Sequence, residues 1–223
     1  KNKNLDSINK YTITASGGNF YKYRYQDLIN ITPEQAITHP KWKMGKKVTV
    51  DSSTLMNKGL EIIEACILFN IEPNKINALI HPESIIHGLI EFKDSSIHAF
   101  LSQPSMEVSI SSLLFDDNNV KLDNHKLDLS SIGSLNFVEI DSDKFKAIEL
   151  AKYSLNHGGL GPAILNYTNE LMVSLFLDNK ISFTDITENN KKIMELFMLD
   201  NNNIKNPSIN DIIHSFTIID NYT

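Results

Sequence analysis

The spacing of apolar residues predicts a sheet in the first half of the chain. Alternating or β-branched runs are typical of strands, and they occur at residues 11–14, 47–51, 76–81, 85–92 and 96–102. Asp94 and Ser95 supply a turn between the last two runs, which makes them a hairpin. These runs predict a mainly antiparallel sheet with helices covering one face.

A long apolar helix follows the second of these runs. Residues 55–69 carry leucine, methionine, isoleucine and cysteine around most of the helix, and small hydroxyl residues before it can cap its start. On a helical wheel, Asn57, Lys58 and Glu61 fall within one arc of about 100°. A helix this apolar is mostly buried, so its single polar face should look into a cleft or onto a partner.

Helices dominate the second half of the chain. Apolar residues at helical spacing predict a small bundle of four helices, over residues 143–156, 162–179, 186–199 and 208–221. The polar, Asn- and Asp-rich segment before them is expected to be a linker. The predicted fold is therefore α+β, with a catalytic domain at residues 1–115, a linker at 116–142 and a helical bundle at 143–223.

Composition excludes several classes of function. The net charge of −6 argues against a nucleic-acid binder, although Lys46, Lys47 and Lys58 leave room for a local basic pocket. No apolar run approaches the roughly 20 residues of a membrane span. The single cysteine, Cys66, excludes a disulfide framework and fits a reducing compartment. We expect it to be a buried structural thiol and not a nucleophile.

The polar face of residues 55–69 has a specific chemical interpretation. Ser52, Asn57 and Lys58 bring hydroxyl, amide and ammonium donors to a helix N-terminus, which suits a phosphate group. Glu61 has the wrong charge for phosphate but suits a hard divalent cation. The simpler alternative is a solvated face on which Lys58 and Glu61 form an i, i+3 pair, stabilising the helix by about 0.2–0.5 kcal/mol. The residues alone leave both interpretations open.

The same stretch resembles a known family. Residues 50–61 (VDSSTLMNKGLE) are similar to the signature of the 1-deoxy-D-xylulose 5-phosphate reductoisomerases, the NADPH- and metal-dependent enzymes of non-mevalonate isoprenoid synthesis. Further similar segments lie at residues 14–18 (TASGG), 39–45 (HPKWKMG), 80–87 (IHPESIIH) and 165–170 (LNYTNE). The resemblance spans most of the chain, and several long motifs in order are more specific than one short pattern.

The resemblance implies a reaction and the residues that serve it. A homodimer would isomerise 1-deoxy-D-xylulose 5-phosphate with the help of Mn²⁺, Mg²⁺ or Co²⁺, and reduce the product with NADPH to 2-C-methyl-D-erythritol 4-phosphate. Glu61 would be a metal ligand and, with His39 at the sugar, a catalytic residue. The residues implied to hold the substrate's phosphate are Ser16, Ser52, Asn57 and Lys58.

Other implied roles concern the cofactor and a lid. Gly45 and Met106 match positions near the nicotinamide cofactor, and Trp42 and Met44 belong to a flap that closes over the substrate. The chain departs from the family at Ser105 and Ser109, where an aspartate and a second proline are usual. It departs again at 115–116, where Phe-Asp replaces Trp-Pro. These changes put the local packing and the dimer surface in doubt.

Part of what the family needs is missing from these residues. They contain no G-x-G-x-x-G or P-loop motif, and the family's NADPH-binding domain and remaining metal carboxylates precede the region of resemblance. The chain starts at Lys1 without an initiator methionine, signal peptide or transit sequence, so we expect it to begin within a larger protein. It would be the substrate half of an enzyme of the cytoplasm or a plastid-type organelle, not secreted and inactive alone.

Two other classes of function remain open from the residues. One is a metal-dependent sugar-phosphate isomerase or lyase that uses no nicotinamide. The other is a helical partner module without catalytic activity, in which Lys58 and Glu61 only solvate the surface. Dependence of the intact protein on nicotinamide would exclude the first, and phosphate binding would exclude the second.

Overall fold

The computed structural model describes residues 5–38, 44–115, 126–200 and 204–222. These form two compact units, each built from two stretches of the chain. The sheet unit consists of Lys1–Ser16 and Asn74–Ile140, and the helical unit of Gly17–Pro73 and Asp141–Thr223. The units therefore interleave along the sequence and do not follow one another as the three consecutive segments expected above.

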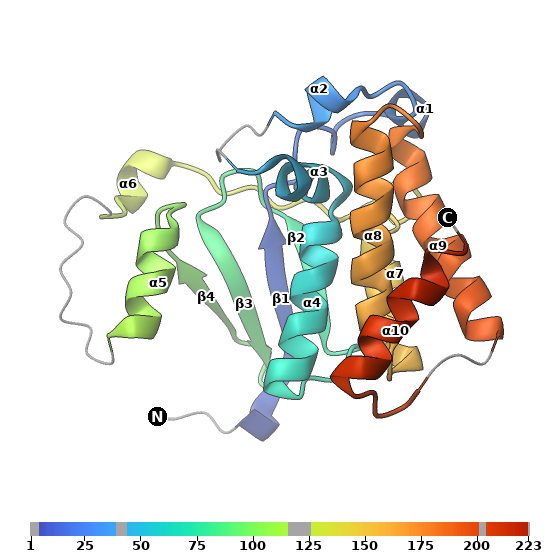
Figure 1. Ribbon diagram of the computed structural model, residues 1–223. Coiled ribbons are helices and arrows are strands. Elements are labelled where there is room, and N and C mark those ends of the chain that lie inside the picture. The colour runs from blue at the N-terminus through green and yellow to red at the C-terminus, as the bar shows by residue number, and fades with distance from the viewer. Residues whose placement is uncertain (1–4, 39–43, 116–125, 201–203, 223) are drawn as a thin grey trace. The chain divides into compact units, whose positions relative to one another are not determined.

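The sheet unit is built on four strands in the order β2-β1-β3-β4 (Figure 1). Their bounds are Ile8–Ala15 for β1, Ile76–Ile80 for β2, Ile86–Phe92 for β3 and Ile97–Leu101 for β4. The β1–β3 and β3–β4 pairs are antiparallel, and the β1–β2 pair is parallel. This confirms the predicted α+β class and the mainly antiparallel sheet.

Local contacts explain how the sheet is held. In the β3–β4 turn, Asp94 Oδ1 accepts hydrogen bonds from the backbone N–H and hydroxyl of Ser96, and Ser95 is left-handed at φ 64°. This confirms the predicted hairpin. Ile80 and Val138 exchange two backbone hydrogen bonds of 2.9 and 2.8 Å, which ties part of the expected linker to β2. The remaining short elements of this unit are Leu5–Ser7 (η1), Met106–Leu114 (α5) and Leu129–Ile132 (α6).

The prediction of a strand at residues 47–51 is wrong. Lys46–Thr54 forms helix α3, with Gly45 as its N-cap and Leu55 as its C-cap. The Thr49 hydroxyl donates back to the Gly45 carbonyl at 2.9 Å, so this β-branched residue supports the first helical turn. Val50 is fully buried in the helical conformation. Packing has therefore overridden the weak β preference of the segment.

The helical unit holds eight described helices. The first four are Tyr25–Leu28 (α1), Pro33–Ala36 (α2), α3 and Met56–Phe69 (α4). The C-terminal helices are Ala147–His157 (α7), Gly161–Leu177 (α8), Phe183–Leu199 (α9) and Ile209–Ile219 (α10). These four confirm the helices predicted for this region. α8 packs against α7, α9, α10 and α3, while α4 packs against α7 (Figure 1).

An aromatic anchor in this unit had no assigned role in the sequence. Phe20 is buried, and its ring meets Phe183 of α9 edge-on with 5.5 Å between centroids. The Lys144 ammonium donates to the backbone carbonyls of Tyr21 and Tyr23. These contacts join the segment before α1 to the C-terminal helices, which sequence periodicity could not reveal.

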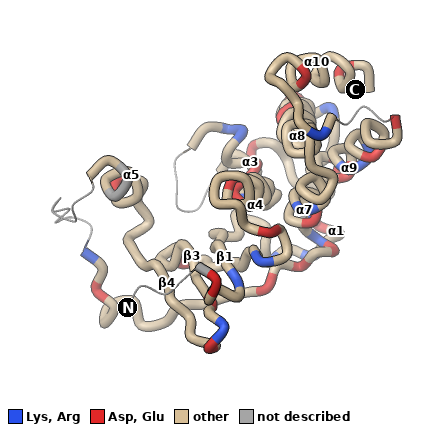
Figure 2. The backbone as a smooth tube through the Cα atoms, turned by 90° about the horizontal axis from the view of Figure 1, so that it is seen from below, with Lys and Arg blue, Asp and Glu red and all other residues tan. Residues whose placement is uncertain are grey.

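The distribution of charged residues and the burial of Cys66 agree with what the composition predicts. Basic and acidic residues are interspersed along the described backbone in both units (Figure 2). No helix among the described residues is long and apolar enough to cross a membrane.

Cys66 of α4 is buried, and burial raises the pKa of its thiol while Lys152 opposes the shift. A buried thiol with a raised pKa is a poor nucleophile, in agreement with its predicted structural role.

We expect Gly59→Val to destabilise the protein by about 1–3 kcal/mol, because α4 and α7 meet too closely at this position to admit a side chain. A Cβ at Gly59 would lie 3.0 Å from the Ala147 carbonyl oxygen and 3.3 Å from the Ala151 Cβ. Valine is the better helix former, so any loss reports packing. Urea unfolding measures it, with the exposed Ile67→Val as the control on the same helix. Equal midpoints for the two variants would contradict the close contact.

Candidate functional site

The candidate site lies where α3 turns into α4. Leu55 joins the two helices in the left-handed conformation, at φ 63°, and its side chain is 1% exposed. Its carbonyl accepts the N–H groups of Lys58 and Gly59, both at 3.1 Å. The hydroxyl of Thr54 accepts the N–H of Met56 at 3.3 Å. The N–H groups of Met56, Lys58 and Gly59 are therefore paired at the start of α4, and Asn57 and Lys58 occupy its first turn.

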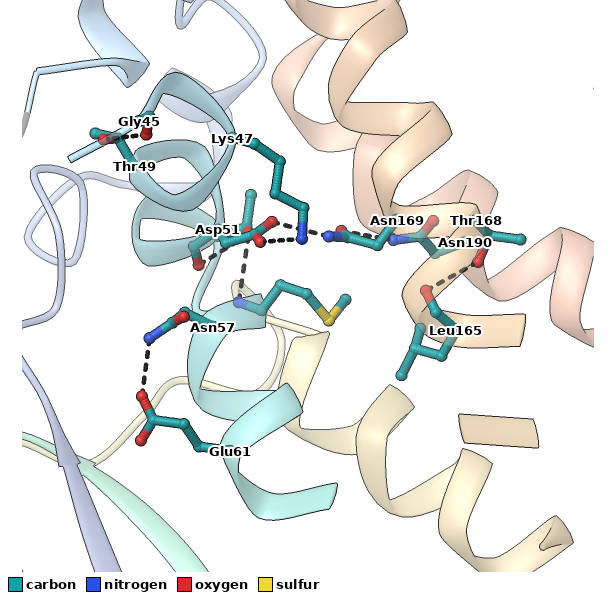
Figure 3. A network of polar contacts seen from close by, with 12 residues as sticks. Gly45, Lys47, Thr49, Asp51, Asn57, Glu61, Leu165, Thr168, Asn169 and Asn190 are labelled. Carbon is teal, nitrogen blue, oxygen red and sulfur yellow. Dashed lines mark hydrogen bonds and ion pairs between the residues drawn. The ribbon is translucent and has the colours of Figure 1, made fainter. Parts of the chain in front are cut away.

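The polar face of α4 has the composition predicted from the helical wheel. Asn57 Nδ2 donates to Glu61 Oε1 at 2.9 Å (Figure 3), and Lys58 Nζ lies 2.6 Å from Glu61 Oε2. The Lys58 side chain is 13% exposed and that of Glu61 39%. The two donors expected to hold a phosphate group thus share one carboxylate.

Ser52 lies one turn before the end of α3, beside a glycine turn. Gly17 and Gly18 both have positive φ, at 86° and 59°. A Cβ on Gly18 would come within 2.9 Å of the Ser53 Cα and 3.0 Å of the Ser52 carbonyl oxygen. Glycine at 18 is therefore required for this close approach as well as for its backbone conformation. Ser16, the fourth expected phosphate ligand, precedes this turn in the sequence as the last residue of the sheet unit.

A buried polar network ties α3 to the C-terminal helices (Figure 3). Asp51 is 2% exposed, and its carboxylate lies 2.6 Å from Lys47 Nζ. Asn169 Nδ2 of α8 donates to Asp51 Oδ1 at 2.8 Å, and Asn190 Nδ2 of α9 donates to Asn169 Oδ1 at 3.1 Å. Burial raises the pKa of the Asp51 carboxyl, against the opposing effect of Lys47 and Asn169.

The sequence analysis assigned no role to this network. Its only signal was that both residues lie inside the motifs of the resemblance, Asp51 in residues 50–61 and Asn169 in residues 165–170. The two residues are 118 positions apart, so no local pattern could pair them.

The remaining expected site residues fall in different places. His39 and Trp42 lie outside the described residues. Gly45 is the N-cap of α3, where an added Cβ would meet no atom of the described residues within 4 Å, and Met44 before it is exposed. Met106, in the sheet unit, is the exposed first residue of α5.

One departure from the family has a visible local role. The side chain of Ser105 accepts the N–H of Glu107 at 3.2 Å and so caps α5. Serine therefore serves the start of this helix at the position where the family has aspartate.

The residues around Glu61 do not by themselves make a metal site. The carboxylate is accompanied by an amide and an ammonium, and an ammonium opposes a nearby cation. Across the described ranges, no group of three or more His, Cys, Asp or Glu residues could hold a metal ion. Glu61 is at most one ligand of a site whose other ligands lie elsewhere.

The chain matches two family descriptions. Residues 1–69 match the 1-deoxy-D-xylulose 5-phosphate reductoisomerase C-terminal domain, and residues 101–218 match the DXP reductoisomerase C-terminal domain. The reductoisomerase of Caldanaerobacter subterraneus is 44% identical over 214 residues, which cover 96% of this chain and 55% of the relative. That of Sulfurihydrogenibium sp. is 44% identical over 220 residues, covering 99% of this chain and 57% of the relative.

Solved structures agree with these matches. A DOX-P reductoisomerase in complex with NADPH, fosmidomycin and magnesium superposes with a TM-score of 0.89 at 34% identity, over 97% of this chain and 54% of that one. The reductoisomerase of Zymomonas mobilis in complex with NADPH gives 0.83 at 35% identity, with the same coverage. The chain spans about half the length of the relatives it matches. The motifs, the fold and these similarities together establish that the chain belongs to the 1-deoxy-D-xylulose 5-phosphate reductoisomerase family.

Proposed function

We propose that this chain is the substrate-binding part of an enzyme that isomerises 1-deoxy-D-xylulose 5-phosphate and reduces it with NADPH to 2-C-methyl-D-erythritol 4-phosphate. The observation that carries the proposal is the polar face of α4, where Asn57 and Lys58 meet at Glu61. The family relationship favours this function over an isomerase or lyase without nicotinamide, and over a module without activity.

The binding step follows from the charges on this face. A sugar phosphate carries nearly two negative charges and several acceptor oxygens, so it attracts Lys58 more strongly than a single carboxylate does. Lys58 and Asn57 would exchange Glu61 for phosphate oxygens, and Ser52 with Ser16 would add hydroxyl donors. Lys58 is only 13% exposed and would keep a charged partner after the exchange. Glu61 is 39% exposed, so its carboxylate can regain water when it is released.

Metal and cofactor need groups outside this face. The solved relatives hold NADPH and magnesium, and in this enzyme the cation would polarise the substrate's oxygens while NADPH supplies the hydride. Glu61, once Lys58 turns to phosphate, is free to serve as one cation ligand. His39 at the sugar, Gly45 and Met106 at the cofactor, and Trp42 and Met44 in a lid stay predictions of the resemblance.

The homodimer would form through the sheet unit. Strand β4 is an edge of the sheet and all five of its residues are exposed. The apolar surface includes Ile97 and Phe100 of β4 and continues onto α5 at Met106, Ile110 and Leu114. An exposed apolar edge strand invites pairing with another chain, and a second copy covering it would bury this surface.

We expect Lys58→Ala in the full protein to weaken binding of the phosphorylated substrate by about 1.5–3 kcal/mol, the contribution of one charge-assisted hydrogen bond. Affinity for NADPH should stay the same. Calorimetry measures both, and Lys191→Ala, which removes an exposed lysine from α9, is the control of equal charge. Unchanged substrate affinity would exclude Lys58 from the phosphate site.

We expect residues 1–223 alone to fold but not to oxidise NADPH in the presence of substrate and Mg²⁺. They carry no nucleotide-binding motif, and Glu61 is a single carboxylate where a divalent cation needs further ligands. Absorbance at the nicotinamide band follows the reaction. Joining the same residues to the N-terminal part of the Caldanaerobacter enzyme provides the active comparison. Turnover by residues 1–223 alone would refute the proposal that the nucleotide site and the further metal ligands come from outside these residues.

We expect Phe100→Glu to convert the dimer into monomers, because the substitution places charge in the apolar surface of β4. Light scattering after size-exclusion chromatography gives the molar mass. Leu199→Glu, at an apolar residue at the end of α9 that is more exposed than Phe100, should leave the dimer intact. A dimer that persists in both variants would mean that another surface joins the subunits.

A further inference from the structure

The Asp51 carboxylate is an expensive group to bury. At 2% exposure it has lost most of its hydration, which costs several kcal/mol for an ionised group unless partners replace the water. Lys47 Nζ at 2.6 Å and Asn169 Nδ2 at 2.8 Å are those partners. Buried pairs of this kind often contribute no more to stability than apolar residues of the same size. A contribution to stability is therefore a weak explanation for the presence of a buried carboxylate at position 51.

The charge on Asp51 fixes the orientation of the amides behind it. An ionised carboxylate only accepts hydrogen bonds, so Asn169 must turn its Nδ2 toward Asp51 and its Oδ1 toward α9. Asn190 must then donate through its own Nδ2, as it does at 3.1 Å. Asn169 and Asn190 are both fully buried. The network thus admits one arrangement of three side chains on α3, α8 and α9 (Figure 3).

This single arrangement sets the position of α3 against α8. Asp51 is the direct neighbour of Ser52, and the left-handed Leu55 connects α3 rigidly to Asn57 and Lys58. On another side of α3, Gly18 packs against the backbone of Ser52 and Ser53. A rotation of α3 about its axis would break the Asp51–Asn169 bond and move Ser52 out of place.

Building on the proposed phosphate site, we propose that Asp51, held by Asn169 and Lys47, is a positioning residue that fixes α3 and thereby the phosphate donors Ser52, Asn57 and Lys58. Its own oxygens are occupied by Lys47 and Asn169, so it needs no contact with the ligand. Without the Asp51–Asn169 bond, every donor is still present but less well aligned. A misplacement of about 1 Å is enough to weaken the function of such a site steeply.

The test exchanges the two partners in the full protein. Asp51→Ala removes the acceptor, and Asn169→Asp faces Asp51 with a second carboxylate, so each single variant breaks the bond. The double variant Asp51→Asn with Asn169→Asp restores it in the reverse direction, because the amide at 51 then donates to the carboxylate at 169, which can still accept from Asn190. Calorimetry measures the dissociation constant of fosmidomycin, with NADPH and Mg²⁺ saturating, and separately that of NADPH.

The expected result is a loss of fosmidomycin affinity of about ten-fold or more in each single variant, with NADPH affinity unchanged, and recovery to within about three-fold in the double variant. The proposal would be overturned if the single variants bound fosmidomycin as tightly as the unaltered protein does. It would also be overturned if a folded double variant did not recover fosmidomycin affinity. If these single variants do not fold, Asn169→Ala takes their place, because it removes the link to α8 and leaves the Asp51 carboxylate paired with Lys47. Fosmidomycin affinity should then fall with NADPH affinity unchanged, and unchanged fosmidomycin affinity would overturn the proposal.

Lys58→Ala separates this inference from the proposed function. If the unaltered protein does not bind fosmidomycin, or binds it equally after Lys58→Ala, the phosphate site itself is wrong. If Lys58→Ala weakens binding while Asp51→Ala and Asn169→Asp do not, the phosphate site stands and the positioning role of Asp51 is wrong.

Discussion

The left-handed turn at Leu55 is the constraint on which the site depends. A leucine at φ 63° costs about 1–2 kcal/mol relative to the right-handed conformation, and the almost complete burial of its side chain offsets that cost. The turn ends α3 within one residue and starts α4 at once. Ser52 on one side and Asn57 on the other are therefore held by two helices that are joined by a single residue, without a loop between them.

The electrostatics of the site explain how it can be stable before a ligand arrives. Lys58 is nearly buried, and an unpaired ammonium there would be costly. The Glu61 carboxylate accepts hydrogen bonds from both Lys58 and Asn57. The Lys58–Glu61 pair at i, i+3, which the simpler interpretation expects, is therefore present. The pair does not argue against phosphate binding. It satisfies the nearly buried ammonium while no ligand is present, and the proposed phosphate would replace Glu61 as its partner.

Sequence patterns predicted what local periodicity determines. The alternation at residues 86–92 and 97–101 gave two strands, and the helical wheel placed Asn57, Lys58 and Glu61 on one face. The patterns failed where contacts between residues far apart in the sequence determine the structure. Residues 47–51 have the composition of a strand, but burial of Val50 makes them helical. The parallel pairing of β1 with β2 and the bond from Asp51 to Asn169 join segments that are far apart, which no local pattern encodes.

The same long-range contacts change what counts as the catalytic domain. A division near residue 115 would assign α4 and the phosphate donors to one folding unit and the C-terminal helices to another. In the structure, α4 packs its Gly59 against α7, and α3 buries Asp51 against Asn169 of α8. Without α7 and α8, the apolar face of α4 would be exposed and the Asp51 carboxylate would lose one of its two partners. The C-terminal helices are therefore part of the structure that holds the phosphate donors, and their packing contributes directly to the geometry of the site.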